Sequence, residues 1–265
     1  MASTYLSRTQ TNGNRRKFTL SAWVKRTGLG STQTFCGFTT SGYNIEMRFK
    51  SDDTFNFYNY NNSSSTISFL TNRKFRDTNA WYHIVVAVDT EQGTEANRVK
   101  IYVNGVQETS FSTATYPSQN LDAEINISGK TNSIGAFPTG HSFFNGCLSH
   151  IHFIDGTQYA ASDFGSTDST TGEWKINTSP SVTYGTNGFF LLKDDNAVTD
   201  RSGQGNNFAL TAGTLTKTED CPSNVFATLN PLHISDASGN YYLSLGNLRQ
   251  HVTNNDGHRQ TGFTL

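Results

Sequence analysis

Apolar and polar residues alternate along much of the chain, and this pattern predicts β-strands. In residues 18–26 one set of alternate positions is apolar: Phe18, Leu20, Ala22 and Val24. Residues 43–50 alternate in the same way, and their polar positions are Asn44, Glu46, Arg48 and Lys50. A period of two with one polar side is typical of a half-buried antiparallel strand. We therefore expect residues 43–50 to cover a core with one face only.

The stretch 81–107 predicts the centre of the fold. Residues 82–88 are mostly apolar at both sets of alternate positions, so this strand is expected to be covered on both faces. Residues 99–103 form a second strand, and Asn104-Gly105 supplies two residues that tolerate positive φ. That pair is the strongest short-range signal for a tight hairpin. Trp81 is expected to be buried against a neighbouring strand.

Shorter apolar runs predict strands at residues 5–6, 34–38, 54–60, 67–70, 125–127, 133–137 and 143–155. In 143–155 strict alternation places Cys147 with Ile151 and Phe153, and the opposite face carries Leu148, His150, His152 and Ile154. Helix signals are weak. Residues 160–164 are expected to form a single turn, with Ser162 or Asp163 as its cap.

The composition fits one large β-sandwich, or one sandwich and a small appendage. Of the 265 residues only 15% are charged and 34% are hydrophobic, which is low for a globular protein. Nineteen Phe and eleven Tyr compensate, because aromatic rings fill a core that has few aliphatic side chains. We therefore do not interpret the low hydrophobicity as disorder.

Charge and cysteine usage exclude several classes of partner. The net charge is −1 and no long basic run occurs, so nucleic acid is not an expected partner. No stretch has the length of a membrane span, and the first residues lack the apolar segment of a secretory signal. Cys36, Cys147 and Cys221 match no zinc spacing and are expected to be reduced thiols of a protein folded in a cytoplasm.

Three segments carry a family resemblance. FTLSAWVKR (18–26), WYHIVVAVD with IYVNG (81–105) and FFNGCLSHIHFIDG (143–156) resemble the laminin G-like, or concanavalin A-like lectin/glucanase, superfamily. The resemblance implies an all-β fold, a two-sheet antiparallel jelly-roll sandwich.

The segment 162–230 carries a second resemblance. Its motifs TTGEW, YGTNGFFL, DRSGQGNNF and CPSNVFATLNPL resemble structural proteins from the virions of tailed phages of marine bacteria, over roughly residues 5–232. The chain departs from that family at Tyr184 and Cys221. DRSGQGNN lies near the start of many laminin G-like modules but at 200–207 here, which implies a circular permutation. Residues 188–193 and 208–210 are then expected to form strands beside the N-terminal one.

The same resemblance implies the domain organisation. Residues 1–232 are expected to form the laminin G-like sandwich. Residues 233–265 change character, with fewer aromatic residues and scattered polar turns, and are expected to be a docking arm or the start of a second β module. Within them, 241–245 and 262–265 are candidate strands.

The catalytic signature of the superfamily's glucanases is missing. Those enzymes place carboxylates at alternate positions of one strand, so that acid and nucleophile reach the same cleft. We find no such run: residues 124–128 hold one carboxylate, and Asp194 and Asp195 are consecutive, so a strand would direct them to opposite faces. We expect a protein that is not an enzyme.

Two groups of residues are candidate metal sites. His150 and His152 are two positions apart on a strand, which suits a pair of metal ligands with His83 or His141 as a third, but packed or solvent-facing histidines are the favoured interpretation. Asp194, Asp195 and Asp200 are the candidate calcium ligands, because laminin G-like modules often hold calcium at a loop rim. Turn chemistry by Asp and Asn side chains is the competing explanation.

A carbohydrate-binding site is predicted at Tyr58, Asn59, Tyr60 and Asn61. Sugar binders use aromatic rings for stacking and amides for hydroxyl groups. The alternative is a two-stranded tip with cross-strand aromatic pairs.

The leading functional hypothesis is a non-enzymatic phage virion protein, in a fibre, an appendage or a capsid decoration. It rests on the resemblance, which implies homo-oligomers, other virion proteins as partners, a host-surface glycan as a further candidate, no membrane insertion, and a virion location after synthesis in the host cytoplasm. The alternative is a carbohydrate-binding lectin or adhesin, and a glycan depolymerase is the third class.

Overall fold

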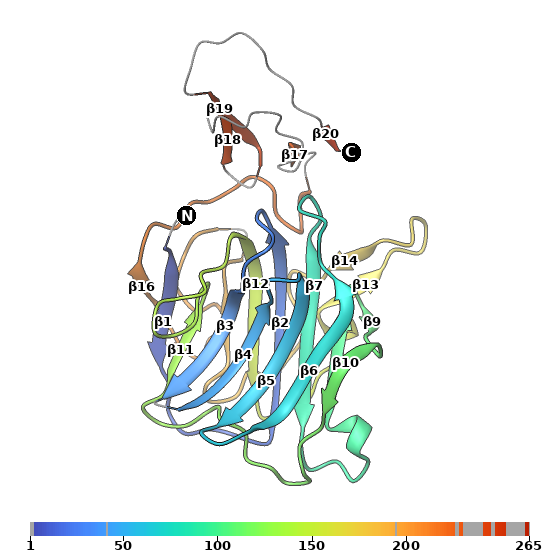
Figure 1. Ribbon diagram of the computed structural model, residues 1–265, viewed down its shortest axis with the longest axis vertical. Helices are drawn as coiled ribbons and strands as arrows, with labels where there is room; N and C mark the ends of the chain where they lie inside the picture. Colours follow the sequence, from blue (N-terminus) through green and yellow to red (C-terminus); the bar gives the residue numbers. More distant parts are fainter. Residues whose placement is uncertain are drawn as a thin grey trace.

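The chain folds as two antiparallel sheets packed face to face. The computed structural model describes residues 3–40, 42–193, 195–225, 228–229, 241–244, 247–252 and 263–264. In Figure 1 the larger sheet lies in front of the smaller one. All strand pairs in both sheets are antiparallel. The expected two-sheet antiparallel sandwich is confirmed.

The large sheet has eight strands, in the spatial order β10 (Phe111–Thr115), β6 (Ser65–Lys74), β5 (Thr54–Asn61), β4 (Tyr43–Phe49), β3 (Gln33–Thr40), β11 (Thr131–Ile134), β1 (Tyr5–Thr9) and β16 (Ala209–Ala212). The small sheet has six, in the order β15 (Phe189–Leu191), β12 (Gly146–Asp155), β2 (Lys17–Arg26), β7 (Tyr82–Asp89), β8 (Val99–Val103) and β9 (Val106–Gln107). Two 3₁₀ turns, η1 (Glu95–Asn97) and η2 (Ala161–Asp163), and a hairpin, β13 (Gly165–Thr167) with β14 (Trp174–Ile176), complete the sandwich.

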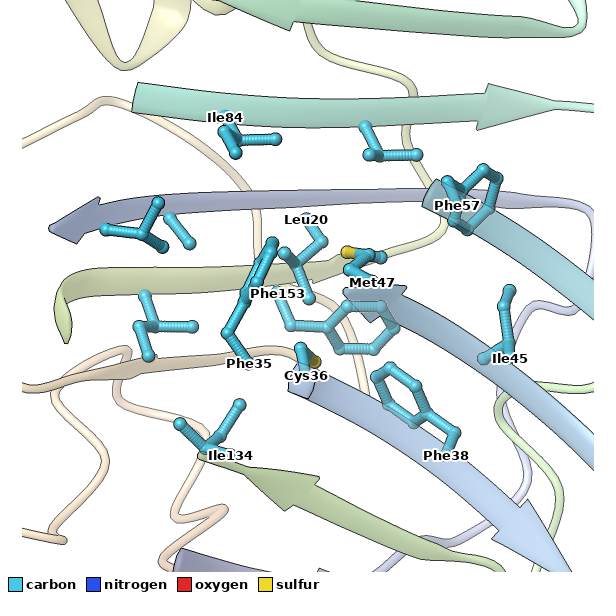
Figure 2. Packing of buried hydrophobic residues seen from close by; sticks show 14 of the residues in the cluster. Leu20, Phe35, Cys36, Phe38, Ile45, Met47, Phe57, Ile84, Ile134 and Phe153 are labelled. Carbon is cyan, nitrogen blue, oxygen red and sulfur yellow. The ribbon is translucent and has the colours of Figure 1, made fainter. Parts of the chain in front are cut away.

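The core lies between the sheets. The inward positions of both sheets meet there, and Figure 2 shows Phe35, Phe38 and Met47 of the large sheet among Leu20, Ile84 and Phe153 of the small one. All six are at most 1% exposed. Aromatic rings supply much of the volume, as the composition predicts.

The predicted centre of the fold is confirmed. β7 lies between β2 and β8, and seven of its eight residues are buried. Asn104 and Gly105 have φ of 48° and 80°, as a tight hairpin requires. Trp81 is only 8% exposed, so its expected burial is also confirmed. Trp174 of β14 lies so close to the hairpin that a Cβ on Gly105 would come within 2.3 Å of its ring.

A β-bulge in β12 overturns the predicted faces of residues 143–155. Ser149 is opposite Trp23, but the next regular pair is His152 with Ser21, and His150 has φ of 45°. The extra residue shifts the alternation by one position. Leu148 therefore packs against the core with Ile151 and Phe153, and Cys147, opposite Lys25, faces away from it.

Other sequence predictions are confirmed in part. The turn at 160–164 is η2, with the Asp163 carboxylate accepting a hydrogen bond from the backbone N–H of Ala160 at 2.8 Å. The expected strand at 125–127 does not form, and the expected strand 133–137 is β11, which ends at Ile134. Ile125 is buried without a strand because its neighbours bond to loops: the N–H of Ala123 donates to the carbonyl of Arg15 at 3.0 Å.

The two strands that were expected to lie beside the N-terminal strand belong to different sheets. Residues 209–212 form β16 beside β1, as expected. Residues 189–191 form β15, which pairs with β12 in the small sheet instead of with the N-terminal strand. The reason is that the buried run of Phe189, Phe190 and Leu191 covers the edge of β12 on both faces. The circular permutation itself stays a prediction.

The C-terminal strands lie beyond one end of the sandwich (Figure 1). β17 (Thr228–Leu229) pairs with β20 (Phe263–Thr264), and β18 (Tyr241–Ser244) with β19 (Arg249–Val252). These agree with the candidate strands at 241–245 and 262–265 as far as the described residues reach. Residues 230–240 lie outside the described part, so the domain boundary after 232 stays a prediction. Among the described residues no helix has the length and apolar character needed to cross a membrane.

Candidate functional site

The outer face of the large sheet carries an ordered polar surface on β4 and β5. The antiparallel register places three pairs of outward residues opposite one another: Asn44 with Tyr60, Glu46 with Tyr58, and Arg48 with Asn56. The inward residues between them, such as Met47 and Phe57, belong to the core. Strand alternation therefore gives the two faces different roles. The inward residues pack in the core, and the outward residues are available to contact a ligand. We call these six outward residues the β4–β5 face.

Glu46 is the buried anchor of the β4–β5 face, with only 3% of the residue exposed. Its Oε2 accepts a hydrogen bond from the Thr34 hydroxyl at 2.8 Å, and its Oε1 accepts one from the Tyr58 hydroxyl. Burial, reinforced by the charge of Glu46, raises the pKa of Tyr58. Tyr58 thus remains a neutral donor to the carboxylate, and both side chains are held in one arrangement.

Arg48 lies on top of this pair. Its guanidinium carbon is 4.5 Å from the centroid of the Tyr58 ring. Its Nε donates to Asn56 Oδ1 at 3.2 Å, and its Nη1 lies 3.6 Å from Glu46 Oε2. The side chain is 28% exposed. Stacking and one hydrogen bond therefore fix the guanidinium plane, while part of the group stays in contact with solvent.

Tyr60 and Asn44 extend the surface toward the end of the strands. Asn44 Nδ2 donates to the Tyr58 hydroxyl at 3.1 Å, so the amide is oriented. Tyr60 is half-buried, and within the described part of the chain its hydroxyl has no hydrogen-bond partner. An aromatic ring with a free hydroxyl thus lies beside oriented amide and guanidinium groups.

The loop 135–144 borders the β4–β5 face on one side. Gly37 of β3 is opposite Glu46, and Pro138 packs over Gly37 so closely that a Cβ there would be 2.9 Å from Pro138 Cδ. Within the loop the rings of Phe137 and His141 stack, with centroids 4.5 Å apart and planes inclined by 17°. His141 is exposed. The β4–β5 face is therefore bordered by a loop that carries a stacked pair of aromatic rings.

The structure divides the four residues of the predicted carbohydrate site. Tyr58 and Tyr60 lie on the β4–β5 face. Asn59 points inward, where it accepts a hydrogen bond from the N–H of Glu124 at 2.6 Å and donates to Thr66 at 2.6 Å. Asn61 accepts from the hydroxyl of Ser63 and the N–H of Ser64 and so serves the turn. Alternation explains the division, because consecutive strand residues face opposite sides.

Four residues of the β4–β5 face were missed: Asn44, Glu46, Arg48 and Asn56. A usable signal was present, because residues 44, 46 and 48 are the polar positions of an alternating strand that directly precedes the tyrosines. Whether this face binds sugar stays a prediction.

The candidate calcium ligands that the structure describes interact with other residues of the chain. Asp194 lies outside the described residues. Asp195 forms an ion pair with Arg201. Asp200 accepts hydrogen bonds from the N–H groups of Phe190, Ser202 and Asn206, each at 2.8 Å, which organises its loop. No group of three or more His, Cys, Asp or Glu within the described ranges has the arrangement of a metal site.

Calcium should leave the melting temperature unchanged. The described oxygens of Asp195 and Asp200 are engaged by Arg201 and by loop amides, and calcium needs six to eight oxygen ligands. The measurement is a thermal melt in millimolar calcium chloride beside one in EDTA, with magnesium as the control. A stabilisation that grows with calcium concentration would contradict this expectation and restore the loop-rim site.

The histidines come together in a covered aromatic layer on the outer side of the small sheet. The ring of His83 is stacked between Trp23, at 4.9 Å, and Trp174, at 5.9 Å. The ring of His152 stacks on Phe190 at 4.0 Å, and its centroid is 6.5 Å from that of His150. All three histidines are at most 2% exposed. Their surroundings favour the packing interpretation over a metal site.

The motifs of the segment 184–208 prove to be structural. Asp155, at the end of β12, accepts hydrogen bonds from the N–H of Asn14 at 2.8 Å and of Asn187 at 3.0 Å. Asn187 also exchanges hydrogen bonds with the backbone of Thr11, and Asn206 accepts one from Arg8 at 2.7 Å. Burial raises the pKa of Asp155. YGTNG and DRSGQGNN therefore connect the N-terminal residues 8–14 with the end of β12.

Comparison with known proteins agrees with this architecture. Residues 2–162 match the family model described as the concanavalin A-like lectin/glucanases superfamily. A putative carbohydrate binding protein from Bacteroides ovatus is 14% identical, with 81% of this chain and 57% of that chain covered and a TM-score of 0.52. No curated protein matches the sequence.

Two further solved structures are similar over smaller parts. The SAP-like pentraxin from Limulus polyphemus is 21% identical over 60% of this chain and 72% of that chain, with a TM-score of 0.42. Domains LG4-5 of the mouse laminin alpha1 chain are 13% identical over 59% of this chain and 41% of that chain, with a TM-score of 0.43. Since the family model covers more than half of the sequence, the chain belongs to the laminin G-like family of the concanavalin A-like lectin/glucanases superfamily.

Proposed function

We propose that the chain is a non-catalytic carbohydrate-binding protein and that the β4–β5 face is its site. The observation that carries the proposal is the mutual fixation of Asn44, Arg48, Asn56 and Tyr58 on an open sheet face beside Tyr60. Groups that are held before the ligand arrives lose little conformational entropy on binding, which suits a weak polar ligand. Aromatic rings and amides are also the groups that sugars need.

The chemistry of Glu46 favours binding over hydrolysis. A retaining glycosidase needs two carboxyl groups about 5 Å apart, one of them free to attack. Both oxygens of Glu46 accept hydrogen bonds from hydroxyl groups, and its ionic partner is Arg48. Among the described contacts of Glu46 there is no second carboxyl group. This arrangement supports a site without catalysis.

Tyr60→Ala should abolish most sugar binding without unfolding the protein. The ring is half-buried, and it takes no part in the network that holds Arg48. We expect about a fivefold to tenfold loss of affinity for a glycan identified on an array, since stacking of a sugar on an aromatic ring is worth about 1–1.5 kcal/mol. Titration calorimetry on the full chain is the measurement.

Tyr43→Ala is the matched control for this variant. Tyr43 directly precedes Asn44 in β4 and is 38% exposed. Strand alternation directs its side chain to the opposite side of the sheet from Asn44. Equal losses in the two variants would contradict the assignment of the face. Binding of no glycan by the wild-type chain would contradict the proposed function.

The virion placement, with its homo-oligomers and virion partners, stays a prediction that rests on the resemblance of residues 162–230. It is compatible with the carbohydrate proposal, because many copies on one particle raise avidity by about 10²–10⁴ where geometry permits. A host-surface glycan would then be the ligand. Mass spectrometry of purified virions tests the placement, and the copy number separates a decoration from a fibre.

A further inference from the structure

We propose that the β4–β5 face recognises the carboxylate of an acidic sugar and that Arg48 binds it. The inference rests on the proposed carbohydrate function and names the class of sugar: uronic acids and other sugar acids. Its basis is the position of Arg48 as an oriented and partly exposed cation on a face that otherwise presents neutral groups.

The charge distribution on the β4–β5 face singles out Arg48. The neighbouring strand β6 carries Arg73 and Lys74 at its end, where Lys74 is opposite Thr54. Within the β4–β5 face the two charged side chains are Glu46 and Arg48. They differ in exposure, because the Glu46 side chain is 3% exposed and that of Arg48 28%. A ligand on the β4–β5 face therefore meets one accessible charge of that face, and it is positive.

The Arg48 guanidinium is oriented, but not all of its N–H groups are used in hydrogen bonds to the described residues. One edge is engaged through Nε and Asn56, and one plane rests on Tyr58. The described residues supply no hydrogen-bond acceptor to the terminal nitrogens, since the nearest carboxylate oxygen, Glu46 Oε2, is 3.6 Å from Nη1. The terminal pair of N–H groups is the edge that binds a carboxylate in bidentate fashion.

Glu46 sets the strength of this interaction. Its charge opposes an incoming anion, but hydrogen bonds from Tyr58 and Thr34 hold its oxygens beneath the surface. The expected result is selectivity for acidic over neutral sugars with modest affinity and a clear dependence on salt. The planar fork of Arg48 binds a carboxylate through two parallel hydrogen bonds, and because a sulfate ester can accept the same pair, the two anions are compared directly in the test.

The test uses the full chain and a glycan array that presents each uronic acid oligosaccharide beside its methyl ester and beside a sulfated neutral oligosaccharide of equal length. Wild-type protein should bind the free acids about tenfold more tightly than the esters. Arg48→Gln should remove this difference and retain the residual binding of the esters. Arg48→Lys should retain only part of it, because lysine keeps the charge and loses the fork.

Arg16→Gln is the control, since this arginine is 40% exposed and paired with Asp122 elsewhere on the surface. Melting curves of every variant show that the fold is intact. Equal binding of acids and esters by wild type, or a preference for the sulfated glycan, would overturn the inference while leaving the carbohydrate function standing. Binding of no glycan at all would overturn both.

Discussion

Replacing Asp220 by alanine should lower the free energy of unfolding by about 3–5 kcal/mol, as expected when one partner of a buried ion pair is lost. The side chains of Asp220 and Lys25 are both fully buried, and Lys25 Nζ lies 2.8 Å from Asp220 Oδ2. The same oxygen accepts a hydrogen bond from Trp81 Nε1 at 3.1 Å. Without the carboxylate, the ammonium group of Lys25 keeps its desolvation cost and loses the charge that offsets it.

Chemical denaturation of the full chain measures this effect, and an exposed ion pair supplies the control. Asp122→Ala removes the partner of Arg16, where both side chains are at least 40% exposed, and should cost about 1 kcal/mol or less. The double change Lys25→Met with Asp220→Leu should recover much of the stability, because neither member of the pair then carries a charge. A loss below about 1 kcal/mol for Asp220→Ala would show that Lys25 reaches water in solution.

The pair also explains how the C-terminal part of the chain is attached to the sandwich. Lys25 belongs to β2 at the centre of the small sheet, and Asp220 follows 195 residues later. A buried pair has little tolerance for displacement, so it fixes where the segment around Asp220 crosses the sheet. The network of Asp155, Asn187 and Asn206 fixes the loops 184–188 and 200–207 in the same way.

Apolar residues at alternate positions of the sequence predict the strands that border the core. β2, β4 and β7 were predicted because each has at least one continuous apolar set that the core requires. The strand expected at 125–127 failed for a related reason. Two isoleucines around one polar residue are too short a pattern to separate a strand from a packed loop, and only the partners of the backbone groups decide between them.

The bulge at His150 could not be predicted from the alternation of apolar and polar residues. A bulge adds one residue to one strand, and nothing in FFNGCLSHIHFID marks where alternation is interrupted. The interruption becomes visible only through the pairing partner, β2, which lies more than a hundred residues away in the sequence. The faces predicted for Cys147 and Leu148, which precede the bulge, were consequently wrong.

The candidate site was half predictable. Reading Tyr58 to Asn61 as one cluster treated neighbours in sequence as neighbours in space. The hairpin offers a better rule: once Phe49 is opposite Phe55, antiparallel pairing places Arg48 opposite Asn56 and Glu46 opposite Tyr58. The register of a short hairpin can be inferred from the turn at Asp52 and Asp53. The burial of Glu46 and the orientation of Arg48 cannot, because they depend on Thr34 of β3 and on side-chain packing.

Acidification below pH 6.5 should destabilise the protein steeply through its buried histidines. His83 Nδ1 lies 3.0 Å from Trp174 Nε1, and its Nε2 is 2.8 Å from the Ser21 hydroxyl. The indole N–H can only donate, so Nδ1 must accept and be unprotonated. Burial, with a smaller contribution from His150, lowers the pKa of His83 to about 3. Burial, followed by the charges of His150, His83 and Lys193, lowers the pKa of His152 well below its usual value.

The direction of the effect follows from these lowered pKa values. The unfolded chain takes up protons near pH 6.5, whereas the folded chain leaves both rings neutral, so stability is full above that pH and is lost as the pH falls toward the folded pKa. Each ring contributes about 1.4 kcal/mol per pH unit in this window, or roughly 5 kcal/mol for both over two units. Asp155, whose pKa burial raises, acts in the opposite sense and reduces the net slope.

Urea unfolding between pH 7 and 4.5 measures the slope, and three variants assign it. His83→Gln should flatten the dependence by about one proton whatever it does to the absolute stability, because one ionisable ring is gone. Trp174→Phe should weaken it, since a protonated His83 would no longer oppose an indole N–H. His141→Gln should leave the slope unchanged, because that ring is already exposed to solvent. A stability that is flat from pH 7 to 4.5, or equal slopes for wild type and His83→Gln, would mean that the layer of Trp23, His83 and Trp174 opens to water.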